Sequence, residues 1–160
     1  MARLKEGFLG ALIALIAQFL LGMTVNLFVT IDPNHPNANP TEYFTGVARN
    51  VAWAITSGPS IWLAIHAVFG LLLVLAAINL LVRAVSAGRR GPIIAASVGA
   101  FGVVVAGFNG GSFLNYHQDF SSMLMASGFA IAMVSFAVGL FLTPEGGDLP
   151  EHAGLVDQRS

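Results

Sequence analysis

Four stretches of the chain are apolar over the length that a membrane-spanning helix requires, about 20 residues. They cover approximately residues 8–31, 59–85, 92–110 and 114–142. Because the bilayer core offers backbone N–H and C=O groups no water to bond, each stretch is expected to be a helix. The sequence therefore predicts an all-α fold, a bundle of four transmembrane helices in one domain.

The scarcity of charge supports the same class of protein. Only 9% of the 160 residues are charged and 56% are hydrophobic, whereas about 25% of an average soluble domain is charged. This composition disfavours a soluble globular enzyme, a disordered chain and a nucleic-acid binder, which would need basic patches. With 0 cysteines, disulfides and thiolate metal sites are excluded as well. The expected surroundings are a lipid bilayer.

The basic residues predict the orientation of the bundle. If all four stretches cross the membrane, five of the seven lysines and arginines lie on one side: Arg3, Lys5, Arg83, Arg89 and Arg90. Loops rich in Lys and Arg stay in the cytoplasm. We therefore expect an inner (plasma) membrane protein with both termini in the cytoplasm. Residues 144–160 are polar and are predicted to be a flexible cytoplasmic tail.

Two connections then lie on the outer side. The long one, 32–58, begins with a turn-rich segment of Asn and Pro. It continues with apolar residues at helical spacing, among them Phe44, Val47 and Ala54, which predict an amphipathic helix on the outer membrane face. The short one is the glycine run 109–112.

Two histidines are the candidate site. His66 lies seven residues past Pro59, and His117 lies five residues past Ser112. Both would sit at one depth in helices that descend from the outer side. Ionisable groups inside a bilayer are costly and are functional candidates, and two imidazoles in one layer of a helical bundle can hold a haem iron from both faces. The spacing therefore favours a b-type haem with His66 and His117 as iron ligands.

Two further residues fit this hypothesis. Gly70 lies one turn below His66 and would leave room for the porphyrin. Arg49, the one basic residue placed outside, could hold a haem propionate by a bidentate contact. Each has a plainer interpretation: small residues in membrane helices usually serve helix packing, and Arg49 could be a solvated charge. A single histidine in such a helix is also often a hydrogen-bonded packing residue.

Other chemistry has weaker support. Asp32, His35 and Glu42 share the long outer loop, but their spacing matches no standard zinc or copper site. The chain has no phosphate-binding glycine loop, no Gly-x-Ser-x-Gly and no His-Glu-x-x-His. A stand-alone enzyme is therefore less favoured than an electron-transfer or accessory protein.

Short motifs resemble those of small four-helix membrane haem proteins. They are Ala17–Gly22, Ile65–Leu73, a glycine-rich third span and Tyr116–Gln118. In layout the chain is similar to one half of haem A synthase, over about residues 8–142. The resemblance implies that His66 and His117 take the axial positions of a haem. That enzyme has two such halves, and no motif around Glu42 matches its catalytic carboxylate, so its oxidation chemistry is not implied here.

Three functions follow as hypotheses. The first is a b-type cytochrome that transfers one electron near the outer face. The second is a non-catalytic accessory subunit of a larger respiratory or transport complex. The third is a carrier of a small molecule or lipid, with the outer helix as a lid. The chain would act alone, as a homo-oligomer or within a larger membrane complex.

Overall fold

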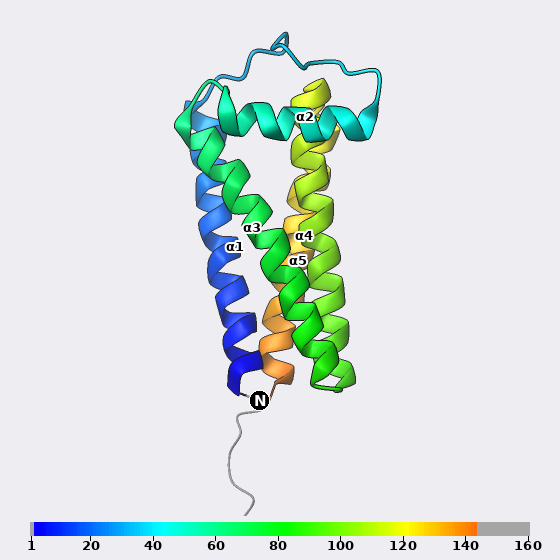
Figure 1. Ribbon diagram of the computed structural model, residues 1–160. Helices are drawn as coiled ribbons and strands as arrows, with labels where there is room; N and C mark the ends of the chain where they lie inside the picture. Colours follow the sequence, from blue (N-terminus) through cyan, green and yellow to red (C-terminus); the bar gives the residue numbers. More distant parts are fainter. Residues whose placement is uncertain (1, 144–160) are drawn as a thin grey trace, which may run out of the picture.

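The computed structural model describes residues 2–143, which form five helices (Figure 1). These are α1 (Ala2–Phe28), α2 (Tyr43–Thr56), α3 (Ile61–Ser86), α4 (Arg90–Tyr116) and α5 (Asp119–Leu142). All except α2 are long and apolar enough to cross a membrane. The predicted all-α fold, with four spans and a shorter helix between the first two, is confirmed. The predicted tail, 144–160, lies outside the described residues.

The outward surface of the four long helices is apolar. Ile13, Leu75, Phe101 and Val134, one from each helix, are all more than half exposed. Helices that are apolar on every side occur where lipid or other protein surrounds them. The chain is thus a multi-pass membrane protein whose long helices contact lipid.

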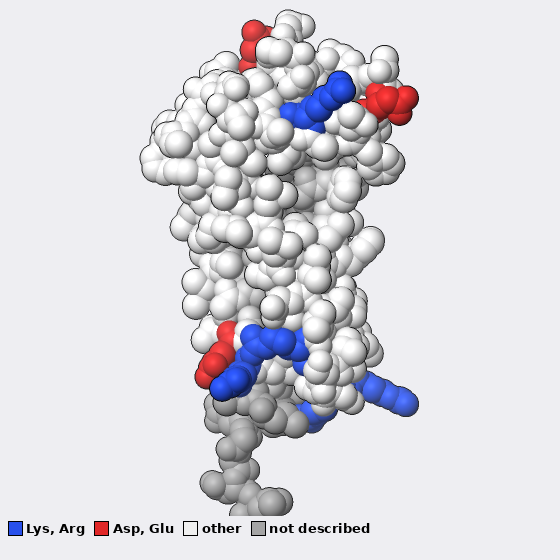
Figure 2. Space-filling model, in the orientation of Figure 1, with Lys and Arg blue, Asp and Glu red and all other residues white. Residues whose placement is uncertain are grey.

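The long helices form a ring in the order α1, α3, α4, α5 (Figure 1). Each contacts its two neighbours in that ring, so α1 lies diagonally opposite α4, and α3 lies opposite α5. Helix α2 lies across one end of the bundle and packs on α3 and α4. We call this end the α2 end, and the other end the basic end, because it carries most of the basic residues (Figure 2).

The closest helix contact joins α4 to α5. A Cβ atom on Gly102 would lie 2.6 Å from the carbonyl oxygen of Gly128, and a Cβ on Gly128 would lie 2.7 Å from that of Gly102. The two backbones therefore touch, as small residues allow in membrane helix pairs. Gly102 and Gly128 therefore serve the packing of α4 against α5.

The boundary between the last two spans differs from the prediction. We expected a connection at 109–112, but α4 continues through these residues to Tyr116. Glycine is tolerated in membrane helices, and Gly111 packs against α2, where an added Cβ would lie 2.7 Å from Val47. The chain turns instead at His117, whose φ of 50° and ψ of 36° are left-handed. The predicted spans 92–110 and 114–142 are corrected to 90–116 and 119–142.

Candidate functional site

One layer of the bundle, near α2, contains no buried residue. Within residues 2–143, buried residues occur on both sides of this layer in every long helix. The layer consists of residues 16–24 of α1, 64–72 of α3, 104–110 of α4 and 122–127 of α5. In all four helices the residues of this layer are thus more exposed than the buried residues on either side of it, and we call it the loose layer.

His66 lies in the loose layer and faces α1. The side-chain amide of Gln18 donates to the backbone carbonyl of His66 at 3.2 Å, and its nitrogen lies 3.5 Å from His66 Nε2. The ring fits beside Gly22, where an added Cβ would approach its Cε1 to 3.1 Å. The other ring nitrogen, Nδ1, is buried and has no hydrogen-bond partner among the described residues.

Gly70 also faces α1. A Cβ at this position would lie 3.0 Å from the side-chain nitrogen of Gln18. The absence of a side chain at Gly70 therefore makes room for Gln18, the residue that contacts His66. Space for a porphyrin beside Gly70 stays a prediction from the sequence.

His117 forms the turn between α4 and α5. Its backbone N–H donates to the Phe113 carbonyl at 2.8 Å and caps α4. Gly or Asn is the usual residue at a left-handed helix end, and another residue there costs about 1 kcal/mol. Strained residues often mark functional positions. Both ring nitrogens of His117 are buried without a partner among the described residues.

Two aromatic rings flank the imidazole of His117. The ring of Phe113 lies 5.1 Å away and that of His35 lies 6.1 Å away, measured between ring centroids. His35 in turn stacks on Trp53 of α2 at 4.1 Å. The orientation of the His117 ring is thus set by packing and not by hydrogen bonds.

His35 itself is held at both ring nitrogens. Its Nε2–H donates to the carbonyl of Leu114 at 2.8 Å, and its Nδ1 accepts from the backbone N–H of Asn37 at 3.4 Å. Neither nitrogen is left for a metal ion in this arrangement. Sequence reasoning treated His35 as part of an ordinary turn, and it carries no local signal of its position because Leu114 is 79 residues away.

A buried pair of amides ties the outer loop and α2 to the last turn of α4. Asn50 Nδ2 donates to Asn115 Oδ1 at 2.6 Å and to the carbonyl of Asn37 at 3.0 Å. The backbone N–H of Asn39 donates to the Asn115 carbonyl at 2.8 Å. Both amide side chains are fully buried. We call this hydrogen-bonded pair, Asn50 and Asn115, the clasp. Because Asn115 lies two residues before His117, the clasp also fixes the turn that holds His117.

The two histidines do not lie at one depth, contrary to our expectation. His66 is the sixth residue of α3, well inside its span, whereas His117 lies between the ends of α4 and α5. The difference arises because α4 continues through the glycine run and carries His117 to the end of the bundle. No described contact joins the two side chains. Leu63 and Leu114, one turn away from His66 and His117 respectively, belong to one hydrophobic cluster.

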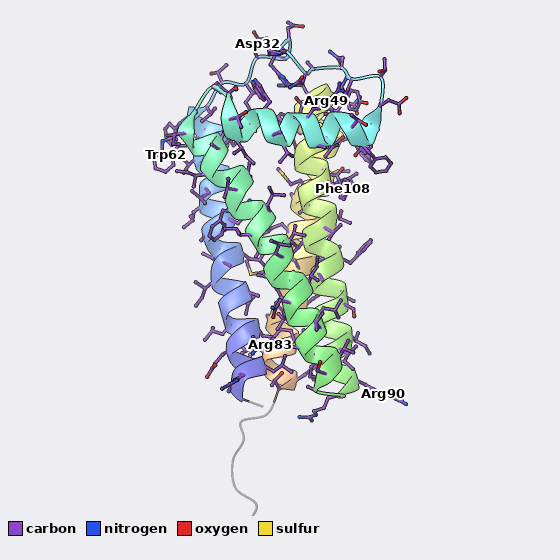
Figure 3. All side chains as sticks on the ribbon, in the orientation of Figure 1. Asp32, Arg49, Trp62, Arg83, Arg90 and Phe108 are labelled. Carbon is purple, nitrogen blue, oxygen red and sulfur yellow. The ribbon has the colours of Figure 1, made fainter. Side chains whose placement is uncertain are left out.

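Arg49 lies on the exposed side of α2 (Figures 2 and 3). It lines a cavity of about 150 Å³ together with Gly46 and the loop residues Pro36–Ala38 and Pro40. No hydrogen bond or ion pair joins its guanidinium to another described residue. A second cavity, about 240 Å³ and apolar, lies between α4 and α5 towards the basic end. Neither cavity is lined by His66 or His117.

The loop 32–42 does not assemble a metal site from its acidic residues. Within residues 2–143, no group of three or more His, Asp or Glu side chains is arranged to hold a metal ion. The weaker hypothesis of a zinc or copper site at Asp32, His35 and Glu42 therefore lacks support. No known protein family, curated protein or solved structure matches this chain.

Proposed function

We propose that this chain is a membrane b-type cytochrome, with His66 and His117 as the ligands of one haem and one-electron transfer as its function. The observation that carries the proposal is that both imidazoles keep buried nitrogens without a partner, His66 at Nδ1 and His117 at both positions. Buried polar atoms are rarely left so, and a bound group is one explanation for each. A neutral imidazole has one nitrogen that carries no proton, and such a nitrogen can bind haem iron.

The loose layer supports the same proposal. A cofactor between helices needs a part of the bundle where the chain's own side chains do not fill the interior. His66 lies in the layer without buried residues. His117 would bind the haem iron from the end of the bundle, and His66 would bind it from within the bundle.

Each ligand has residues that hold it in place. Phe113 and His35 fix the ring plane of His117, and the clasp of Asn50 and Asn115 fixes its backbone. Gln18 holds the backbone of His66, and groups around a metal ligand commonly orient it in this way. When bound, the haem would supply one-electron chemistry, which the protein directs through its ligands and surroundings.

The charge distribution bears on orientation. Among the basic residues of the described part, 2–143, Arg3, Lys5, Arg83, Arg89 and Arg90 lie at or near the basic end, and Arg49 alone lies at the α2 end (Figure 2). By the positive-inside rule we propose that the basic end faces the cytoplasm of an inner membrane and the α2 end faces outward. Arg49 then lies on the side towards which propionates would point, and its pairing with a propionate is part of the proposal.

The resemblance to one half of haem A synthase implies the same pair of ligands. It does not extend to oxidation chemistry. Glu42, which lies in the loop where that enzyme carries its catalytic carboxylate, is exposed on the N-terminal side of α2.

A second candidate function rests on the loose layer alone. A layer without buried residues, with α2 across the end above it, also suits a carrier of a small apolar molecule. This alternative gives no role to the nitrogens of His117. It predicts a colourless protein that copurifies with an apolar compound, whereas an accessory subunit would be colourless and copurify with larger proteins.

The test is a reduced-minus-oxidised optical spectrum of the purified chain. We expect a Soret band and an α-band that are lost in both His66→Ala and His117→Ala. His35→Gln is the matched control, because His35 is also a buried histidine but both its nitrogens are bonded within the protein. A spectrum without haem bands, or bands that survive in both alanine variants, would refute the proposal.

A further inference from the structure

The corner where α1 and α3 meet at the basic end carries a contact between two arginines. A side-chain nitrogen of Arg83, near the end of α3, donates to the backbone carbonyl of Arg3 in the first turn of α1. Gly7 lets the side chain of Arg83 lie against α1, because a Cβ there would approach Arg83 Nη1 to 3.3 Å. The guanidinium of Arg83 is thus held at the backbone of a second arginine, and the carbonyl of Arg3 takes up only part of its five N–H donors.

The charge at this corner is strongly positive. Arg83 lies at this corner (Figure 3), and Figure 2 shows a basic patch there with acidic atoms at its edge. Arg3 lies in the first turn of α1, next to Arg83. Glu6 is the single acidic residue within residues 2–143 that lies at the basic end, since Asp32, Glu42 and Asp119 lie at the α2 end. Within residues 2–143, Arg3 and Arg83 against the one carboxylate of Glu6 leave a net positive charge at this corner.

The corner also lies at the level of lipid headgroups. Arg3 is the first residue of one membrane span, and Arg83 is three residues from the end of another. Further into the span the surfaces of the two helices are apolar, with Ile13 of α1 and Leu75 and Ile78 of α3 exposed. A ligand of this corner therefore meets basic groups at the surface and apolar helix faces below it.

We infer that this corner is a binding site for an anionic glycerophospholipid, held through its phosphodiester by Arg83 and Arg3. Guanidinium groups bind phosphate oxygens through paired, charge-assisted hydrogen bonds. The acyl chains of the same lipid would lie along α1 and α3. This inference rests on the basic end alone and is independent of the haem proposal.

The test compares lipids retained by the purified full-length chain. The protein is placed in bilayer nanodiscs of phosphatidylcholine with a minor share of phosphatidylglycerol, released into the gas phase, and its bound lipids are counted by native mass spectrometry. We expect phosphatidylglycerol to be enriched over phosphatidylcholine on the wild-type chain. Arg83→Gln is expected to lower that enrichment about fivefold, since a basic residue near a membrane surface contributes on the order of 1 kcal/mol to binding of anionic lipid.

Arg90→Gln is the matched control. Arg90 is an exposed arginine at the same end, and its side chain points away from the bundle on the other side (Figure 3). We expect this variant to keep the enrichment of the wild-type chain. Equal losses in Arg83→Gln and Arg90→Gln would show a diffuse charge effect and would overturn the site, as would a wild-type chain without preference for phosphatidylglycerol. Should Arg83→Gln fail to fold, Arg3→Gln gives the same comparison, because only the backbone of Arg3 bonds to Arg83.

Discussion

Replacing Asn115 by alanine is expected to destabilise the α2 end of the bundle by about 2 kcal/mol. Asn115 is fully buried and accepts a hydrogen bond of 2.6 Å from Asn50 Nδ2. Its own amide donates a longer bond of 3.4 Å to the Tyr43 carbonyl. Truncation removes both bonds, although Asn50 keeps its bond to Asn37 and the Tyr43 carbonyl keeps its helical donor in α2. A hydrogen bond contributes about 0.5–1.5 kcal/mol, so the loss of two bonds gives the estimate of about 2 kcal/mol.

The two amides are expected to be coupled. Asn50→Ala alone leaves Asn115 Oδ1 and the Asn37 carbonyl without their donor, and we expect it also to cost about 2 kcal/mol. In the double variant neither amide remains to be stranded, so its cost should fall short of the sum. Interhelical hydrogen bonds in membrane proteins show coupling energies of about 0.6 kcal/mol on average, with a maximum near 1.7. We expect about 1 kcal/mol here, because the bond is short and buried.

The assay is equilibrium unfolding in mixed micelles with a denaturing detergent, followed by far-ultraviolet circular dichroism. Asn109→Ala is the control, since Asn109 bonds only to the Val105 carbonyl of its own helix, and its removal should cost less than about 1 kcal/mol. Costs of Asn50→Ala and Asn115→Ala that simply add in the double variant would show that the clasp is not a coupled pair. The same conclusion would follow if Asn109→Ala were as destabilising as Asn115→Ala.

Two further predictions test the packing of the bundle and the role of the outer loop. Gly139→Ala should destabilise the protein by about 1–3 kcal/mol, the usual cost of overpacking, because the new Cβ would lie 2.2 Å from the ring of Phe8. Gly10→Ala should be neutral or stabilising in the same unfolding assay, because nothing lies within 4 Å of the new Cβ. A Gly10→Ala variant that is less stable than Gly139→Ala would contradict this packing. His35→Phe keeps an aromatic ring beside Trp53 but removes the hydrogen bonds to the loop and to α4. Backbone hydrogen exchange in residues 32–42 should therefore become faster. Unchanged exchange would show that stacking alone holds the loop.

The spans could be predicted from the sequence because the bilayer imposes a simple rule: a stretch of about 20 apolar residues must be a helix. The end of α4 could not be predicted in the same way. A run such as Asn109–Ser112 breaks a helix in water, but in a membrane bundle glycines also let helices approach, and Gly111 does so against Val47. Sequence alone does not show which of the two applies.

The same distinction explains why the position of His66 could be predicted from the sequence and that of His117 could not. The depth of His66 follows from its place inside a well-defined span, so its position was predicted. The position of His117 depends on the last turn of α4, which is set by contacts with Asn39 and Asn50, far away in the chain. The approach of His35 to His117 depends on these contacts too. Local patterns carry no information about such pairs.

The haem content of the purified chain tests the central claim most directly. We would measure the ratio of haem to protein by the pyridine haemochrome method in the wild-type chain, in His66→Ala and in His117→Ala. The account predicts about one b-type haem per chain in the wild type and almost none in either variant while both remain folded. A wild-type chain without haem, or variants that keep the wild-type ratio, would contradict it.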